Sequence, residues 1–132
     1  MADTRLAIVR HPPTGEPEDG VSLCNEIRAR VGADGASLLL FHDASEMAHA
    51  TAGYAKAFMG LDAELGPRVV QVVCAIPRPV PRMMAWTVAV VSSKEWKIFK
   101  STDEAIAHLA TQGFNLSAAE ISSGPRVSVR GA

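Results

Sequence analysis

The chain has few of the features that identify large classes of protein. Of its 132 residues only two are cysteines, 5% are aromatic, and the formal net charge is −1. A general nucleic-acid binder usually has a strong basic excess, which this composition lacks. Cys24 and Cys74 lie in apolar surroundings without a Cys or His at metal-ligand spacing, so we expect two buried, reduced thiols.

Long hydrophobic runs are absent as well. The longest, from Met83 to Val91, has nine residues and is interrupted by Thr87, whereas a membrane helix needs about 18 or more. The first ten residues contain no long apolar region before a cleavage site, so no secretory signal is predicted. We therefore expect no transmembrane segment and, by default, a cytoplasmic location.

Charged side chains are unevenly distributed along the chain. Residues 1–65 carry five basic and ten acidic side chains, whereas residues 66–100 carry six basic ones and one acidic one. Two interpretations are open: a solvated surface on which the signs happen to cluster, or a basic face for an acidic partner or an anionic ligand. The apolar fraction of 48% is sufficient for a buried core and argues against disorder.

Hydrophobic periodicity predicts strands and helices in alternation. Continuous apolar runs predict strands at 6–9, 37–41, 69–76 and 96–99. Helical spacing, caps and breakers predict helices at 18–31, 52–65, 83–91 and 102–112. This order predicts one small α/β domain over residues 1–112, with a mostly parallel sheet of four to five strands and covering helices. Residues 113–132 are predicted as a C-terminal tail that is flexible or adds an edge strand.

The predicted helix at 83–91 is unusual because it is apolar nearly all round. We expect it to pack deeply against the sheet. The alternatives are a self-association face and the wall of an apolar cavity, with Met83, Met84 and Trp86 as adaptable lining residues.

Ligands bind at the carboxyl ends of the strands in open parallel sheets, and these positions carry no GxGxxG or GxxxxGK[ST] phosphate motif. His42, Asp43 and Ser45 lie together at one such end, but no nucleophile elbow accompanies them and adjacent strand residues point to opposite faces. We expect Asp43 and Ser45 to accept backbone N–H groups in the loop. Because His49 and His108 are isolated in the sequence, we predict no metal site, no cofactor and no enzyme activity.

The run LLLFHDASEM (38–47), the helix and strand that follow it, and the segment from Ile98 to Leu109 together resemble the STAS domains. The pattern is closer still to their SpoIIAA-like branch, which is related to the Sec14 (CRAL-TRIO) lipid-binding fold. The resemblance covers residues 37–110 and implies a small α/β domain that acts by binding. It departs from the branch at residues 15–32, which are predicted as a helix where the branch has the second strand of a hairpin.

The resemblance implies a non-enzymatic regulatory or scaffold module that acts by protein–protein interaction, as anti-sigma factor antagonists do. In those proteins, phosphorylation of a Ser at a helix N-terminus changes the charge of the docking face. The matching stretch here, 49–53, has no Ser pair, and its only hydroxyl belongs to Thr51, which also fits a plain N-cap. The expected contact or switch residues are Asp43, Ser45, Glu46, Met47 and Thr51.

The relation to the Sec14-like fold implies an alternative function, a binder or carrier of a small apolar or amphipathic, lipid-like ligand. The helices at 52–65 and 83–91 then line the pocket, and an arginine meets an anionic head group. The ligand-binding residues of this alternative are Tyr54, Phe58, Arg78, Arg82, Met83, Met84 and Trp86. The expected partner is a protein, a second copy of the chain in a homodimer, or a lipid-like molecule, and not nucleic acid.

Overall fold

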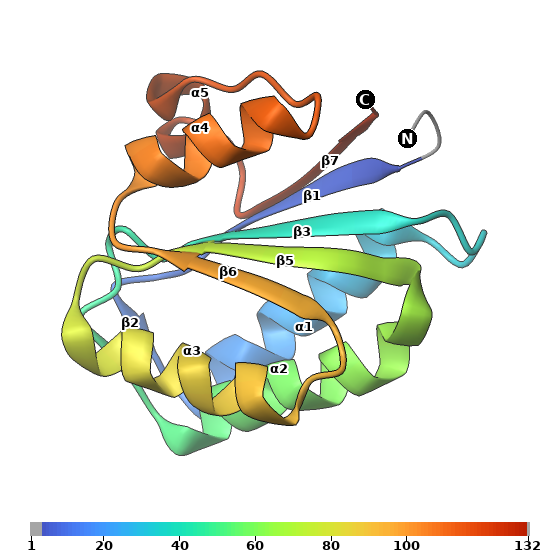
Figure 1. Ribbon diagram of the computed structural model, residues 1–132. Helices are drawn as coiled ribbons and strands as arrows, with labels where there is room; N and C mark the ends of the chain where they lie inside the picture. The colour runs from blue at the N-terminus through green and yellow to red at the C-terminus, as the bar shows by residue number, and fades with distance from the viewer. Residues whose placement is uncertain (1–3, 132) are drawn as a thin grey trace.

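The computed structural model describes residues 4–131 and contains a five-stranded sheet in the order β6-β5-β3-β1-β7 (Figure 1). The parallel strands are β1 (Arg5–Arg10), β3 (Leu38–Asp43), β5 (Val69–Ala75) and β6 (Glu95–Phe99). β7 (Val127–Gly131) is antiparallel to β1. The predicted single α/β domain with a mostly parallel sheet is confirmed.

Helices cover both faces of this sheet (Figure 1). α1 (Pro17–Val31), α2 (Ala52–Leu65) and α3 (Pro79–Val91) lie on one face. α4 (Thr102–Thr111) and α5 (Ala118–Ser122) lie on the other. Within residues 4–131 no helix combines the length and the apolar character that crossing a membrane requires.

Local sequence signals explain where α2 begins and ends. The Thr51 side chain accepts a hydrogen bond from the backbone N–H of Tyr54 at 3.1 Å, which makes it the N-cap. Gly66 ends the helix with φ 57°, a conformation that glycine adopts at little cost. A 3₁₀ turn (Gly66–Arg68) then leads into β5. The predicted bounds 52–65 are therefore confirmed.

The central strand β3 separates two cores. All six of its residues are buried, as a strand covered on both faces requires. Leu38 and Leu40 pack into the cluster beneath α1 and α2, whereas Leu39 and Phe41 pack into the cluster beneath α4 and α5. Side chains of one strand thus alternate between the two faces of the sheet.

The segment after residue 112 belongs to the same domain as the rest of the chain. Phe114 and Ile121 are buried in the core beneath α4 and α5. Val127 is fully buried in β7, which forms an edge of the sheet. The structure has the edge strand, which is one of the two alternatives predicted for this segment. The boundary expected after residue 112 does not separate two structural units.

Two short strands were not predicted. β2 (Thr14–Gly15) and β4 (His49–Ala50) pair in parallel as a separate two-stranded sheet. This pairing holds the loop after β1 beside the segment that leads into α2, next to the candidate site described below.

The expectation that the apolar helix packs deeply is wrong. α3 lies beside α2 and over β6, an edge strand, so within residues 4–131 protein packs against only one of its sides. Only Pro81 and Val88 of α3 are buried. The large apolar side chains that remain 52% to 81% exposed on this helix are Val80, Met83, Trp86, Val90 and Val91.

Candidate functional site

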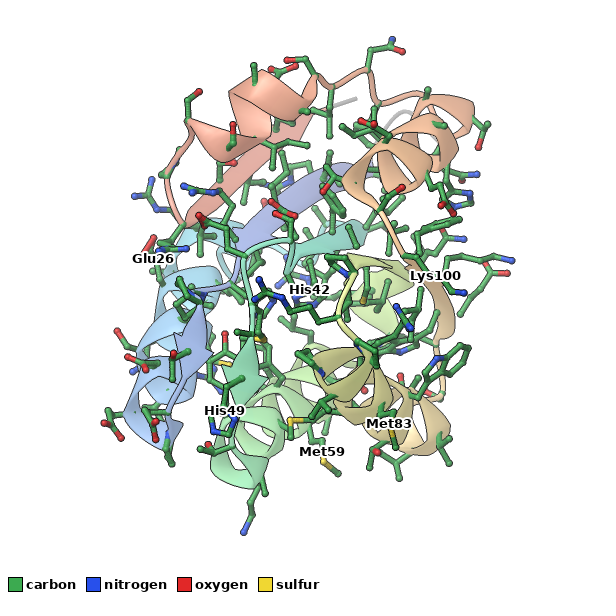
Figure 2. The ribbon with its side chains drawn as sticks, turned by 90° about the vertical axis from the view of Figure 1, so that its left-hand side faces the viewer. Glu26, His42, His49, Met59, Met83 and Lys100 are labelled. Atoms are coloured by element: carbon green, nitrogen blue, oxygen red, sulfur yellow. The ribbon has the colours of Figure 1, made fainter. Side chains whose placement is uncertain are left out.

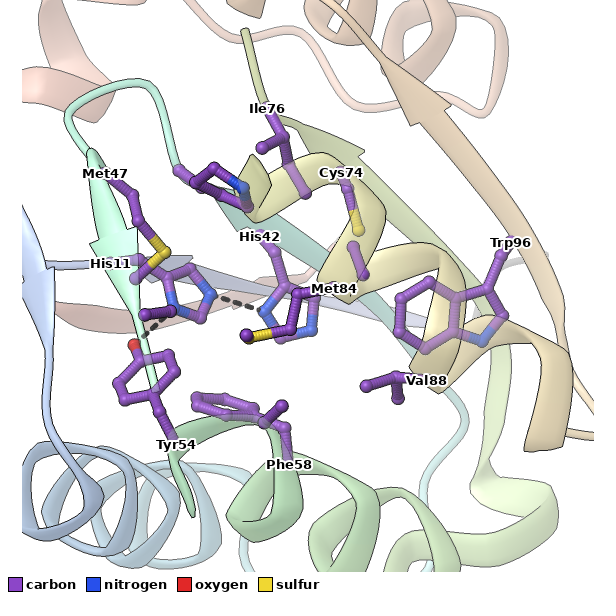
Figure 3. A pocket seen from close by; sticks show the side chains of 15 residues that line it. His11, His42, Met47, Tyr54, Phe58, Cys74, Ile76, Met84, Val88 and Trp96 are labelled. Carbon is purple, nitrogen blue, oxygen red and sulfur yellow. Dashed lines mark hydrogen bonds between the residues drawn. The ribbon is translucent and has the colours of Figure 1, made fainter. Parts of the chain in front are cut away.

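Two histidines meet at the carboxyl ends of neighbouring strands. His42 lies in β3 and His11 directly follows β1, the strand paired with β3 in parallel. Both side chains are buried. Nε2 of His11 lies 2.9 Å from Nδ1 of His42, and Nδ1 of His11 lies 2.5 Å from the hydroxyl of Tyr54 on α2 (Figure 3). The three side chains form one hydrogen-bonded chain.

This chain forms the polar wall of a cavity of about 80 Å³ between the sheet, α2 and α3 (Figure 3). The rest of the lining is apolar and comes from the segment before α2, from α2 and α3, and from β5 and β6. Its larger members are Met47, Phe58, Cys74, Ile76, Met84, Val88 and Trp96. In the wider view of Figure 2, His42 lies near the centre of the molecule, whereas His49, Met59 and Met83 lie toward its periphery.

Burial keeps the polar wall uncharged at neutral pH. Loss of hydration lowers the pKa of His42 to about 4, although the charge of Asp62 acts in the opposite direction. The pKa of His11 is also well below its ordinary value of 6.5, because of burial first and then the nearby His42 and Arg126. Burial raises the pKa of the Tyr54 hydroxyl well above 10.

The hydrogen-bond partners define the direction of this chain. A neutral imidazole has one N–H, so one ring nitrogen donates and the other accepts. The Tyr54 hydroxyl has no second acceptor among the described residues, so its O–H is satisfied only by donating to His11 Nδ1. His11 then donates from Nε2 to Nδ1 of His42, and His42 carries its own proton on Nε2.

Nε2 of His42 is the unpartnered end of this chain. It has no hydrogen-bond partner within residues 4–131 and is directed into the space between Phe58 and Trp96 (Figure 3). The ring of Phe58 meets the imidazole edge to face at 5.6 Å, and the indole of Trp96 lies nearly parallel to it at 6.5 Å. Aromatic packing therefore fixes the orientation of an N–H donor that faces an apolar space.

Some of the residues predicted for a ligand pocket line this cavity and others do not. Tyr54, Phe58 and Met84 are lining residues. Met83 and Trp86 are on the outer side of α3, 68% and 52% exposed. A helix of 13 residues places its side chains all round, so only one stripe of α3 can reach the cavity.

The two predicted arginines are outside the lining as well. Arg82 donates from Nη1 to the carbonyls of Ile76 and Pro77, both at 3.1 Å. Arg78 is exposed, with Nη1 3.5 Å from the carbonyl of Glu46. Neither of the two predicted arginines therefore lies where it would meet an anionic head group in the cavity.

Other basic side chains of the 66–100 segment also have internal partners. Arg68 donates to the carbonyls of Val31 and Gly32 at the end of α1. Lys94 pairs with Asp62 at 3.0 Å, and both side chains are largely buried. The basic excess of this segment is thus partly structural. The basic side chains of the segment that are exposed are Arg78, Lys97 and Lys100.

The residues predicted for contact or switching have different environments. Asp43 is buried, and its Oδ1 accepts a hydrogen bond from the backbone N–H of Ser45 at 3.2 Å, as predicted. The Ser45 side chain accepts none among the described residues. Ser45 and Glu46 are exposed, Met47 is buried and lines the cavity, and Thr51 caps α2.

Sequence reasoning missed His11 and Trp96 as site residues. The signal for His11 was its place directly after the first strand, equivalent to that of His42 near the end of the second. Such residues meet only if the two strands are neighbours, and spacing does not determine strand order. Trp96 lies in the strand predicted at 96–99, and its contact with His42 depends on how β6 pairs with β5.

Among the described residues that line the cavity, the thiol of Cys74 is not activated as a nucleophile. Cys74 is the register partner of His42 on β5, but burial raises the pKa of its thiol, which stays protonated. Both cysteines are buried and free. Across residues 4–131, no three or more His, Cys, Asp and Glu side chains are grouped to hold a metal ion.

Comparisons of the chain with family models, curated proteins and solved structures give no match. The resemblance to STAS domains therefore stays a prediction from the sequence pattern.

Proposed function

We propose that this domain binds a small, uncharged, mostly apolar ligand that carries one hydrogen-bond acceptor. The observation that supports this proposal is the N–H at Nε2 of His42, which faces an apolar cavity without a partner. Nε2 of His42 is not a fully enclosed atom and is reached from the cavity, so a ligand oxygen can accept its hydrogen bond, which contributes about 0.5–1.5 kcal/mol. A charged ligand loses its hydration in the same space without gaining a counter-charge.

The volume of the cavity sets the size of the ligand group. An apolar cavity of about 150 Å³ in another protein holds benzene, and the cavity here measures about 80 Å³. Met47 and Met84 are flexible lining side chains that adapt to different occupants. A short aliphatic segment with a carbonyl, ether or hydroxyl oxygen fits this volume, and an aromatic ring fits only when Met47 and Met84 move aside.

The proposal is binding without catalysis. A general base works best when its pKa lies near the working pH, and the pKa of His42 is about 4. The thiol of Cys74 is protonated for the reason given above, which makes it a poor nucleophile. The polar groups of the wall thus favour recognition of a neutral molecule over proton transfer or covalent attack.

A protein-interaction role is a second proposal, supported by the segment between β3 and α2. Met47 lines the cavity, whereas the preceding Ser45 and Glu46 are exposed to solvent. A ligand that moves the Met47 side chain also moves the surface that these two residues present. Ligand occupancy and partner binding are then coupled, which is compatible with the regulatory role implied by the STAS resemblance.

Three compounds of similar shape test the ligand proposal: acetophenone, ethylbenzene and benzoate. In titrations followed by NMR, acetophenone should bind about 3- to 10-fold more tightly than ethylbenzene. This ratio corresponds to the free energy of one neutral hydrogen bond. Benzoate should bind weakest. In the same titration, shifts of the Ser45 and Glu46 amides are expected if the segment responds to the ligand.

The variant His42→Phe keeps a ring and removes the donor, so it should abolish the preference for acetophenone. The matched control His49→Phe alters an exposed histidine outside the cavity and should keep the preference. Failure of both neutral compounds to bind saturably, or equal affinities of wild-type protein for the two, would contradict the proposal. Unchanged Ser45 and Glu46 amides in a saturated complex would contradict the coupling alone.

A further inference from the structure

The outer side of α3 is an apolar surface that the domain itself does not cover. We call it the outer α3 face; Figure 2 shows Met83 on this side of the molecule. Its exposed members recur at helical spacing along three turns and include no charged side chain. They are Val80, Met83, Trp86, Val90 and Val91.

The area of this face is large for a monomer of this size. From the exposed fractions of its five apolar side chains, it amounts to roughly 600 Å², the upper end of the range of about 300–600 Å² for the largest apolar patch of a typical monomer. Two such faces in contact bury on the order of 1,200 Å², the lower limit of stable protein interfaces.

We propose that the outer α3 face is the interface of a homodimer in which two α3 helices pack antiparallel across a twofold axis. A twofold axis places one patch against its own copy, so a continuous apolar row meets an identical row. Val80 of one copy then lies near Val91 of the other, and the turn that contains Trp86 lies near the axis.

Charge complementarity selects the antiparallel orientation. The N-terminal end of α3 carries Arg78 and Arg82 together with the positive end of the helix dipole. The last turn of α3 has no basic residue, and its carbonyls form the negative end of the dipole. Antiparallel packing brings these opposite ends together, whereas parallel packing opposes the arginines of the two copies.

A lipid surface is the competing occupant, and the composition of α3 disfavours it. A helix that lies in a membrane interface has a polar face rich in Lys and Arg opposite its apolar face. In α3 the opposite face is the cavity wall, formed by Pro81, Met84, Ala85 and Val88. Arg82 is the only charged residue between Pro79 and Val91.

Sedimentation equilibrium of the full chain from about 1 μM to about 1 mM tests the proposal. We expect a concentration-dependent dimer. Val90→Glu, at an 81% exposed position, should weaken dimerisation at least about 100-fold, because a carboxylate without a partner is buried at the interface. Val91→Lys is the second variant, and circular dichroism shows that each variant is folded.

The matched control is Val21→Glu, which puts the same charge on a 54% exposed valine of α1 and should leave the dimer intact. Disulfide cross-linking tests whether the two α3 helices are antiparallel. In a mixture of Val80→Cys and Val91→Cys chains, disulfides between positions 80 and 91 should form in preference to disulfides between two copies of position 80. The native cysteines are buried and do not compete.

A wild-type chain that stays monomeric at about 1 mM overturns the proposal. If such a monomer co-sediments with phosphatidylcholine–phosphatidylglycerol vesicles, the face binds a lipid surface. If it does not, neither a second copy of the chain nor a lipid surface occupies the face. A dimer that persists in Val90→Glu and Val91→Lys also overturns it. None of these outcomes bears on the ligand proposal, because the outer α3 face and the cavity wall use different side chains of α3.

Discussion

Nε2 of His11 lies 2.9 Å from Nδ1 of His42, so two buried imidazoles share one hydrogen bond at the carboxyl ends of adjacent parallel strands. Tyr54 supplies the proton at the far end of the chain, and His42 presents its own proton to the cavity. Each of the three side chains has one N–H or O–H, so the nitrogen that is protonated in one ring determines which nitrogen is protonated in the other.

The first prediction concerns the tautomers of the two rings. Long-range ¹H–¹⁵N correlation spectra at neutral pH should show His11 and His42 both protonated at Nε2. Tyr54→Phe removes the O–H that His11 Nδ1 accepts, so His11 should then populate the Nδ1-protonated form as well. A wild-type spectrum with His42 protonated at Nδ1 would reverse the direction of the chain and remove the donor on which the ligand proposal depends.

The second prediction is a loss of stability in mild acid. The folded-state pKa of His42 is about 4, below its ordinary value of 6.5, so between these values the unfolded chain binds a proton that the folded chain does not. The free energy of unfolding should therefore fall as pH drops below about 6.5, by on the order of 3 kcal/mol by pH 4 from His42. The pKa of His11 is shifted in the same direction and adds to this loss.

Urea denaturation at a series of pH values measures this dependence. His42→Gln should flatten the curve between pH 4 and 6.5, because the side chain no longer takes up a proton on unfolding. His49→Gln should keep the wild-type slope, because the exposed His49 is not part of the buried chain. An identical slope in the wild type and in His42→Gln is incompatible with a buried neutral imidazole at this position.

Much of the fold could be predicted because the signals are local. Thr51 and Gly66 define the ends of α2 through a cap and a left-handed glycine, and both are visible in the sequence. The continuous apolar runs of β3 and β5 are typical of strands buried on both faces. Such features depend on a few neighbouring residues, so periodicity and capping rules detect them.

The site could be predicted only in part because its geometry is non-local. His11 and His42 are 31 positions apart, and they meet because β1 pairs with β3 in the sheet order. The exposure of Trp86 has the same origin, since α3 lies at an edge where no further helix of the described chain covers its outer side. The two-residue strands β2 and β4 are too short to show any period.

The third prediction concerns the Thr51 cap. Thr51→Ala removes the acceptor for the Tyr54 N–H and should destabilise the protein by about 1 kcal/mol, the usual value of an N-cap side chain. Thr51→Ser keeps the hydroxyl and should recover most of this loss. Ser45→Ala, at an exposed position whose side chain caps nothing in the described chain, should change stability by less than about 0.5 kcal/mol in chemical denaturation.

The fourth prediction uses a glycine that packs against the hydrogen-bonded chain. A Cβ atom at Gly15 would lie 2.8 Å from Cδ1 of Tyr54, so Gly15→Ala must displace the tyrosine ring. We expect a loss of about 1–3 kcal/mol in stability and weaker binding of acetophenone, because the hydroxyl leaves its place beside His11.

Gly60→Ala is the matched control: nothing lies within 4 Å of its Cβ, and alanine in the interior of α2 should stabilise the protein by about 0.5–1 kcal/mol. Denaturation midpoints and NMR titrations of both variants check the pair, and a Gly15→Ala protein with wild-type stability and affinity would show that the position of Tyr54 does not control the site.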